Sequence, residues 1–134
     1  MEALAKLLKA LSSAYLIGRC WRCAEVLDAL SSGRGGEGSL LDAYGLYKEL
    51  YSSAISASGL RCCAAEPLSP ALDEEACEIY GGVPLRGAEA LCCAPCPEIR
   101  EEEVLEALDA VEQDPQALVR AVALAQAPTR RRRG

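Results

Sequence analysis

Apolar residues recur every three or four positions through the first thirty residues of the chain, which is the period of an α-helix. This spacing predicts one long helix from residue 2 to about residue 30, bent near residue 12, 13 or 18. The glycine-rich segment 31–39 ends it, because glycine makes helix formation costly. The apolar positions are Leu4, Leu8, Leu11 and Tyr15, followed by Leu16, Cys20, Cys23, Leu27 and Leu30.

The same period continues from about residue 40 to residue 58 and predicts a second helix, ended by Gly59. Tyr44, Tyr47 and Tyr51 lie on one face of it, where each ring can pack while its hydroxyl reaches a wetter edge. A short third helix is predicted over residues 71–80, with Ser69 as its cap.

The last third of the chain predicts up to three more helices. A short helix over residues 84–93 would be stopped by Pro95 and Pro97, which lack amide hydrogens. Glu98 begins an acidic stretch whose charges suit a helix N-terminus, and apolar residues at helical spacing follow. A final helix is expected from residue 115 to about residue 127, with Asp114 as its cap.

No stretch shows the alternation rich in Val, Ile or Thr that is typical of strands. The predicted fold class is therefore all-α, a compact bundle of five or six helices cross-linked by cysteines. Residues 1–127 are expected to form a single helical domain, and residues 128–134 a flexible basic tail.

The charge of the chain argues against general nucleic-acid binding. The net charge is −6, and without Arg130, Arg131, Arg132 and Arg133 it is −6 − 4 = −10. An acidic body repels phosphate, so nucleic acid is expected to bind through this arginine tail or not at all.

Composition also bears on source and location. The chain has no Asn and no His, and depletion of heat-labile residues is typical of thermophiles. Neither a secretory signal nor an apolar run of about 20 residues is found. We therefore expect a cytoplasmic protein from a thermophile without membrane contact, since hyperthermophiles are the exception that carries intracellular disulfides.

The eight cysteines are the main candidates for chemistry, and their even number favours structural disulfides. Bridges between helices are expected, with Cys77 joined to Cys62 or Cys63, and the Cys20/Cys23 region joined to another helix. The candidate residues are Cys20, Cys23, Cys62, Cys63, Cys77, Cys92, Cys93 and Cys96.

Two alternatives use the Cys-x-x-Cys motifs CWRC and CAPC. Cys20, Cys23, Cys93 and Cys96 could offer four thiolates to zinc or to an iron–sulfur cluster, in a helical protein associated with nucleic acid. CAPC is also similar to the thioredoxin-type Cys-x-Pro-Cys motif at Cys93, Pro95 and Cys96, which implies a dithiol oxidoreductase. Thioredoxins place this motif after a strand, which is not predicted here, and acids follow it.

Other features do not point to catalysis. Without His and with a single Thr, the chain lacks the usual general bases and serine triads, so we do not expect an enzyme. The segment 33–38 is glycine-rich but lacks the Lys and Ser/Thr of a phosphate-binding loop. Trp21 and the tyrosine face are expected in the core. The predicted function is that of a small non-catalytic interaction or assembly protein, stabilised by intramolecular disulfides, that binds a protein partner. An apolar stripe that stays exposed would mark the surface for that partner.

Overall fold

The computed structural model describes residues 2–32, 36–52, 55–57 and 60–126. Within these residues the chain forms six helices and a four-stranded antiparallel sheet. The helices are α1 (Glu2–Gly18), α2 (Trp21–Ser31), α3 (Gly36–Ser52), α4 (Glu74–Ile79), α5 (Glu101–Gln113) and α6 (Pro115–Gln126). The strands are β1 (Ile55–Ala57), β2 (Leu60–Pro67), β3 (Val83–Leu85) and β4 (Leu91–Pro95).

The sheet contradicts the predicted all-α class, because the fold is mixed α and β. Its strand order is β1-β2-β4-β3. Cys93 lies opposite Ala65 of β2 and Val83 of β3, so β4 is paired along both edges. The prediction of a helix over residues 84–93 is therefore wrong. Residues 55–57 also form a strand, where the second predicted helix was expected to continue. Pro84 is tolerated because β3 is an edge strand, where a missing amide hydrogen costs little.

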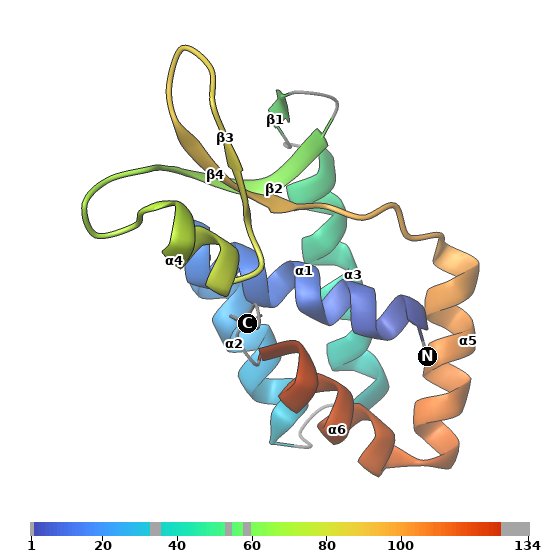
Figure 1. The fold of residues 1–134 in the computed structure, drawn as a ribbon. Helices are drawn as coiled ribbons and strands as arrows, with labels where there is room; N and C mark the ends of the chain where they lie inside the picture. The colour runs from blue at the N-terminus through green and yellow to red at the C-terminus, as the bar shows by residue number, and fades with distance from the viewer. Residues whose placement is uncertain (1, 33–35, 53–54, 58–59, 127–134) are drawn as a thin grey trace, which may run out of the picture.

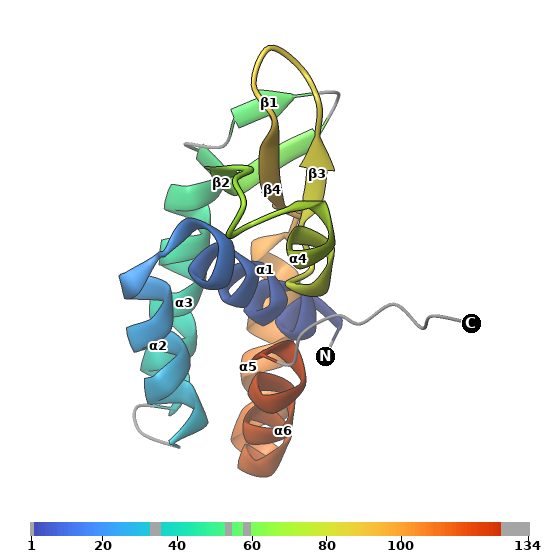
Figure 2. The same cartoon turned by 60° about the vertical axis from the view of Figure 1, so that its left-hand side comes forward.

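Helix α1 lies at the centre of the molecule and runs below the sheet, as Figure 1 shows. It packs against β2, β4 and four of the other helices, α2, α3, α5 and α6. Figure 2 shows the sheet at one end of the molecule and α2, α3, α5 and α6 toward the other. A helix surrounded in this way must be apolar on most of its circumference. The fully buried side chains of α1 include Leu4, Leu7, Leu8, Leu11, Ala14 and Ile17.

The long N-terminal helix predicted from the sequence is in fact two helices. Helix α1 ends at Gly18, Arg19 adopts a left-handed backbone with φ 54°, and α2 begins at Trp21. The break redirects the chain, so that α2 packs on α3 as well as on α1. The ideal Cβ of a residue replacing Gly18 would lie 2.4 Å from the Cβ of Ala64 in β2. The absence of a side chain at position 18 therefore lets the end of α1 approach the sheet.

The remaining predictions for the helices are close to the structure. The N-cap of α4 is Asp73, whose carboxylate accepts from the amide of Ala76, and not Ser69. Ser69 instead closes a turn with Leu72. The last two helices are confirmed within three residues of their predicted starts, while α3 begins at Gly36, inside the segment expected to be a connector. The predicted domain end and the basic tail, residues 128–134, lie outside the described residues.

A small second cluster of buried side chains joins the sheet to α1 and α4. It consists of Ile17, Cys77, Cys92 and Ala94. Gly82 lies against it, since an added Cβ would stand 2.7 Å from the Cys92 Sγ and 2.9 Å from the Cys77 Sγ. Apolar packing thereby holds the sheet against the central helix α1, and the Cys77–Cys92 disulfide joins the sheet to α4.

Candidate functional site

All eight cysteines form disulfides, so the prediction of intramolecular bridges is confirmed. The predicted partners are wrong, because the strands missed from the sequence decide the pairing. Cys77 joins Cys92, and Cys20 joins Cys23 of the same segment rather than another helix. The two remaining bridges are Cys62–Cys93 and Cys63–Cys96.

Two disulfides tie β2 to β4 and to the residue that follows it. Neighbouring residues of a strand point to opposite faces of a sheet. Cys92 and Cys93 of β4 therefore reach different partners. In β2 the pairing register shifts between Cys62 and Ala64, and Cys62 and Cys63 are bonded to Cys93 and Cys96. A backbone hydrogen bond joins the same two segments, since the amide of Cys96 donates to the carbonyl of Arg61 at 2.9 Å.

The bridges differ in what they contribute to the fold. Cys62–Cys93 and Cys63–Cys96 join residues 31 and 33 apart in sequence. Loop closure of that size stabilises the folded chain by about 3.7 kcal/mol each, against less than about 2 kcal/mol for the three-residue separation of Cys20–Cys23. The sheet bridges are thus the structural ones, and Cys20–Cys23 adds least to stability.

Cys20–Cys23 also differs in its exposure. The cysteines of the other three bridges are all buried, and the most exposed of them, Cys96, is 8% exposed. Cys20 is partly exposed, whereas Cys23 is completely buried. Trp21 between them is 68% exposed, so its prediction as a core residue is wrong. It contacts Tyr15 edge to face, with ring centroids 6.0 Å apart.

The disulfide pattern corrects the predicted location. Intramolecular disulfides persist in oxidising environments such as those of secreted proteins, and cytosolic thiols are kept reduced. Four of them in one chain point away from the cytoplasm, so that prediction is wrong. Within the described residues, no helix combines the length and the apolar character that a membrane span requires.

The four-cysteine metal site would require a different arrangement. Cys93 and Cys96 are bonded to Cys62 and Cys63, and Cys20 is bonded to Cys23, so none offers a thiolate. The described part of the chain holds no group of three or more His, Cys, Asp or Glu side chains suited to a metal. The disulfide form therefore does not fit the zinc or iron–sulfur alternative, which stays a prediction for the reduced chain. The arginines at 130–133 lie outside the described residues.

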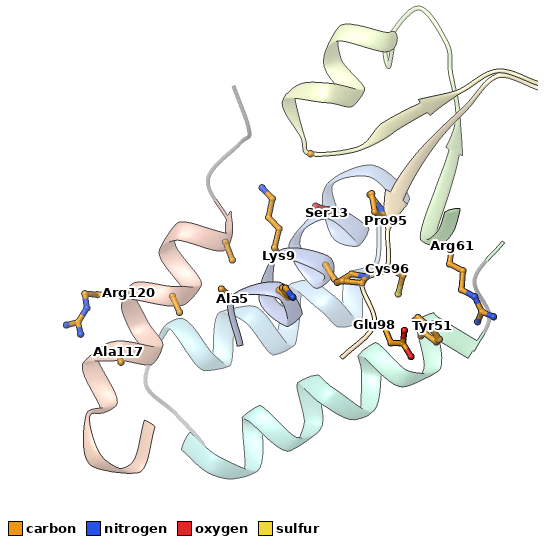
Figure 3. A pocket seen from close by; sticks show the side chains of 16 residues that line it. Ala5, Lys9, Ser13, Tyr51, Arg61, Pro95, Cys96, Glu98, Ala117 and Arg120 are labelled. Carbon is orange, nitrogen blue, oxygen red and sulfur yellow. The ribbon is translucent and has the colours of Figure 1, made fainter. Parts of the chain in front are cut away.

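A groove of about 1110 Å³ lies between α1, α6 and the segment that leaves β4 (Figure 3). Figure 3 shows Ala117 and Arg120 of α6 at one end, Tyr51 and Arg61 at the other, and Lys9 between them. Its floor is made of small apolar residues. They are Ala5 and Ala10 of α1, Ala117, Ala121 and Ala125 of α6, and Pro95 and Pro97.

The rim of the groove is basic. Among the described residues, four cations and one carboxylate line it, although the whole chain has 14 basic and 20 acidic residues. Arg120 is paired with Asp114 at 3.2 Å, and the guanidinium of Arg61 lies 4.9 Å from the ring centre of Tyr51. Burial lowers the pKa of Lys9 from its usual value. The rim residues are Lys6, Lys9, Arg61, Arg120 and Glu98.

The tyrosine face of α3 is largely internal, as predicted. The hydroxyl of Tyr44 donates to the carbonyl of Ile99 at 3.5 Å. The buried hydroxyl of Tyr47 has no hydrogen-bond partner among the described residues. Burial, reinforced by Tyr51, Tyr44 and Glu98, raises the pKa of Tyr47 to about 12, and the nearby backbone of Ile99 offsets part of this rise.

Sequence reasoning missed the groove because its walls come from six separate segments of the described chain. The one signal was the alanine spacing of residues 117, 121 and 125, which marks a smooth helix face. Comparisons with family models, with curated proteins and with solved structures find no match for this chain.

Proposed function

We propose that the protein is a small binding module whose groove, a non-catalytic site, receives an acidic, partly apolar segment of a partner protein. The observation that carries this proposal is a basic groove with an apolar floor in a chain of net charge −6. Such a site differs from the chain as a whole in the sign of its charge.

The size and lining of the groove suit a polypeptide segment. Its volume of about 1110 Å³ is at or above the upper end of the range usual for small-molecule pockets. Ala117, Ala121 and Ala125 present a smooth helix face on which an amphipathic segment can lay its apolar side. Apolar contact with such a floor would provide affinity, and the rim would select the partner.

The charges at the rim favour an acidic occupant. Lys6 and Lys9 lie on one wall and Arg120 on the other, so a carboxylate-rich segment between them would meet cations on both sides. The arginines at 130–133 of the chain itself carry the same sign as the rim and are poor occupants for that reason.

Cross-linking supports a preformed site. Cys96 lines the groove and is bonded to Cys63, and the strand that precedes it is held by Cys62–Cys93. A wall fixed in this way loses little conformational entropy on binding, which favours affinity. Disulfides of this kind also stabilise a protein at high temperature, and a thermophilic source is part of the proposal.

The test uses the oxidised full chain and labelled 16-residue peptides. One peptide carries Glu and Leu at helical spacing, and its counterpart carries Lys in place of each Glu. We expect at least tenfold tighter binding of the Glu peptide by fluorescence anisotropy, with affinity falling as salt is raised.

Two variants of α6 make the test specific. Ala117→Glu places a carboxylate in the groove and should weaken binding of the Glu peptide at least tenfold. Ala123→Glu is the matched control, because Ala123 is exposed on the same helix outside the groove, and it should change affinity less than twofold. Equal effects of the two variants, or tighter binding of single-stranded DNA than of the Glu peptide, would contradict the proposal.

A further inference from the structure

The Cys20–Cys23 disulfide combines three properties that the other bridges lack. It closes a sequence separation of three residues, one of its cysteines is partly exposed, and a largely exposed Trp21 lies between the two. From these we infer that Cys20–Cys23 exchanges electrons with dithiols and disulfides of other proteins. This activity goes beyond the binding role of the groove, whose lining residues do not include Cys20, Trp21 or Cys23.

The two cysteines are placed for different parts in the exchange. Cys20 caps the N-terminus of α2, and its sulfur accepts a hydrogen bond from the amide of Cys23 at 3.2 Å. Cys20 is the partly exposed member, so it is the sulfur that a substrate thiolate can attack. Cys23 is 0% exposed, so it is reached only from Cys20.

The surroundings of Cys20 favour its thiolate form once the bridge is open. Amide hydrogens and the positive end of the helix dipole meet at a helix N-terminus and stabilise negative charge there. The first turn of α2 carries no acidic residue in the sequence. Arg19 precedes the motif and Arg22 lies within it, but they are paired with Glu66 at 3.8 Å and Glu49 at 3.2 Å. The helix terminus is therefore the main source of stabilisation.

The exchange proceeds through a mixed disulfide. A thiolate of a substrate dithiol attacks the Cys20 Sγ, the Cys20–Cys23 bond breaks, and its electron pair goes to Cys23, which takes up a proton. The second substrate thiolate then attacks the substrate sulfur bound to Cys20 and releases Cys20 as a thiol. Two electrons and two protons pass to the protein, and the substrate becomes a disulfide. A low-molecular-weight disulfide such as glutathione disulfide restores the Cys20–Cys23 bond by the reverse steps.

The fold is built to survive both redox states. The other three bridges hold β2, β4 and α4 together, and none of them involves α2. Cys23 remains packed in the main core with Leu27 and Leu30 of α2. Opening the local bridge therefore leaves the contacts of α2 in place, and the exposed indole of Trp21 offers an apolar contact to a polypeptide substrate.

The first experiment measures which bridge opens. The oxidised full chain is exposed to increasing glutathione, alkylated and mapped by mass spectrometry, while the fluorescence of the chain's single tryptophan reports on the motif. We expect Cys20 and Cys23 to be alkylated at least tenfold faster than any other pair. Simultaneous opening of all four bridges, or earlier opening of another, would overturn the inference.

The second experiment measures exchange. The probe is a peptide with two cysteines in a glutathione buffer, and wild-type protein should oxidise it at least tenfold faster than Cys20→Ser/Cys23→Ser. Cys23→Ser should trap a mixed disulfide at Cys20. Trp21→Ala, the control that keeps both thiols, should slow exchange with the peptide but not with glutathione. Equal rates for wild type and the double variant, or a double variant that no longer folds, would make the bridge a structural element and reject the inference.

Discussion

Replacement of Gly18 by alanine should destabilise the protein, although alanine normally favours a helix. Gly18 is the last residue of α1, and a Cβ there would lie 2.4 Å from the Cβ of Ala64. The favourable van der Waals distance between two such carbons is about 3.5 to 4 Å, so the helix end or the strand must move by more than about 1 Å. β2 is bridged to β4 by Cys62–Cys93, which resists that movement.

The magnitude follows from two opposing effects. Alanine in place of glycine in a helix gains about 1 kcal/mol, while overpacking of a closely packed contact costs about 1 to 3 kcal/mol. Because the backbone must shift, we expect Gly18→Ala to lower the free energy of unfolding by about 1 to 2 kcal/mol. Gly45→Ala in α3 is the matched control, since none of the described atoms outside its own helix lies within 4 Å of the new Cβ. It should raise stability by up to about 1 kcal/mol.

Urea unfolding of the oxidised proteins, followed by circular dichroism, measures both changes. The double variant Gly18→Ala/Ala64→Gly removes the overlapping methyl group from the strand. It should recover at least about 1 kcal/mol relative to the sum of the single changes. Changes of the same sign at positions 18 and 45, or strict additivity of the double variant, would refute the close contact between α1 and β2.

Tyr47→Phe should leave stability unchanged or raise it by about 1 kcal/mol, because it removes a hydroxyl without a described partner, whereas Tyr44→Phe loses the bond to Ile99 and should destabilise. The pKa of Tyr47 is raised to about 12 in the folded protein, so wild-type stability should be complete below pH 10 and fall between pH 10 and 12. Urea titrations at pH 8, 10 and 11 check this, and a Tyr47→Phe protein that loses as much stability as wild type would contradict it. Cys62→Ala/Cys93→Ala should cost about 3 to 4 kcal/mol in the same assay, and a loss below about 1 kcal/mol would show that this bridge adds little.

The helices were predictable where the position of charged residues and the spacing of apolar residues indicate the same helix. Glu101, Glu102 and Glu103 occupy the first turn of α5, and Val104 and Leu108 are buried on its inner face, as the acidic start and apolar spacing indicate. The tyrosine face of α3 was predicted on the same basis. The break between α1 and α2 was harder to fix, because it depends on the backbone of Arg19, which adopts a conformation unusual for a residue other than glycine.

The strands were not predictable from local preference. β2 and β4 consist largely of Cys, Ala and Pro, which show neither alternation nor β-branching. Their structure comes from pairing between segments about thirty residues apart and from the sulfur bonds across them. The adjacent pair Cys92-Cys93 was a signal for a strand. Adjacent residues of a strand point to opposite faces, so two neighbouring cysteines can each reach a different partner more easily there than in a helix. The groove and the exposed Trp21 likewise depend on tertiary packing.

The adjacent cysteines of β2 and β4 also determine how the strands can align during oxidation. If β2 slipped by one residue relative to β4, Cys63 would replace Cys62 opposite Pro95. The side chains of β2 would then point to the wrong face of the sheet. Once Cys62–Cys93 and Cys63–Cys96 have both formed, such a slip requires two covalent bonds to break. Disulfide formation thus fixes the pairing register of β2 and β4 covalently. The alanine-rich composition of these strands would otherwise specify that register only weakly.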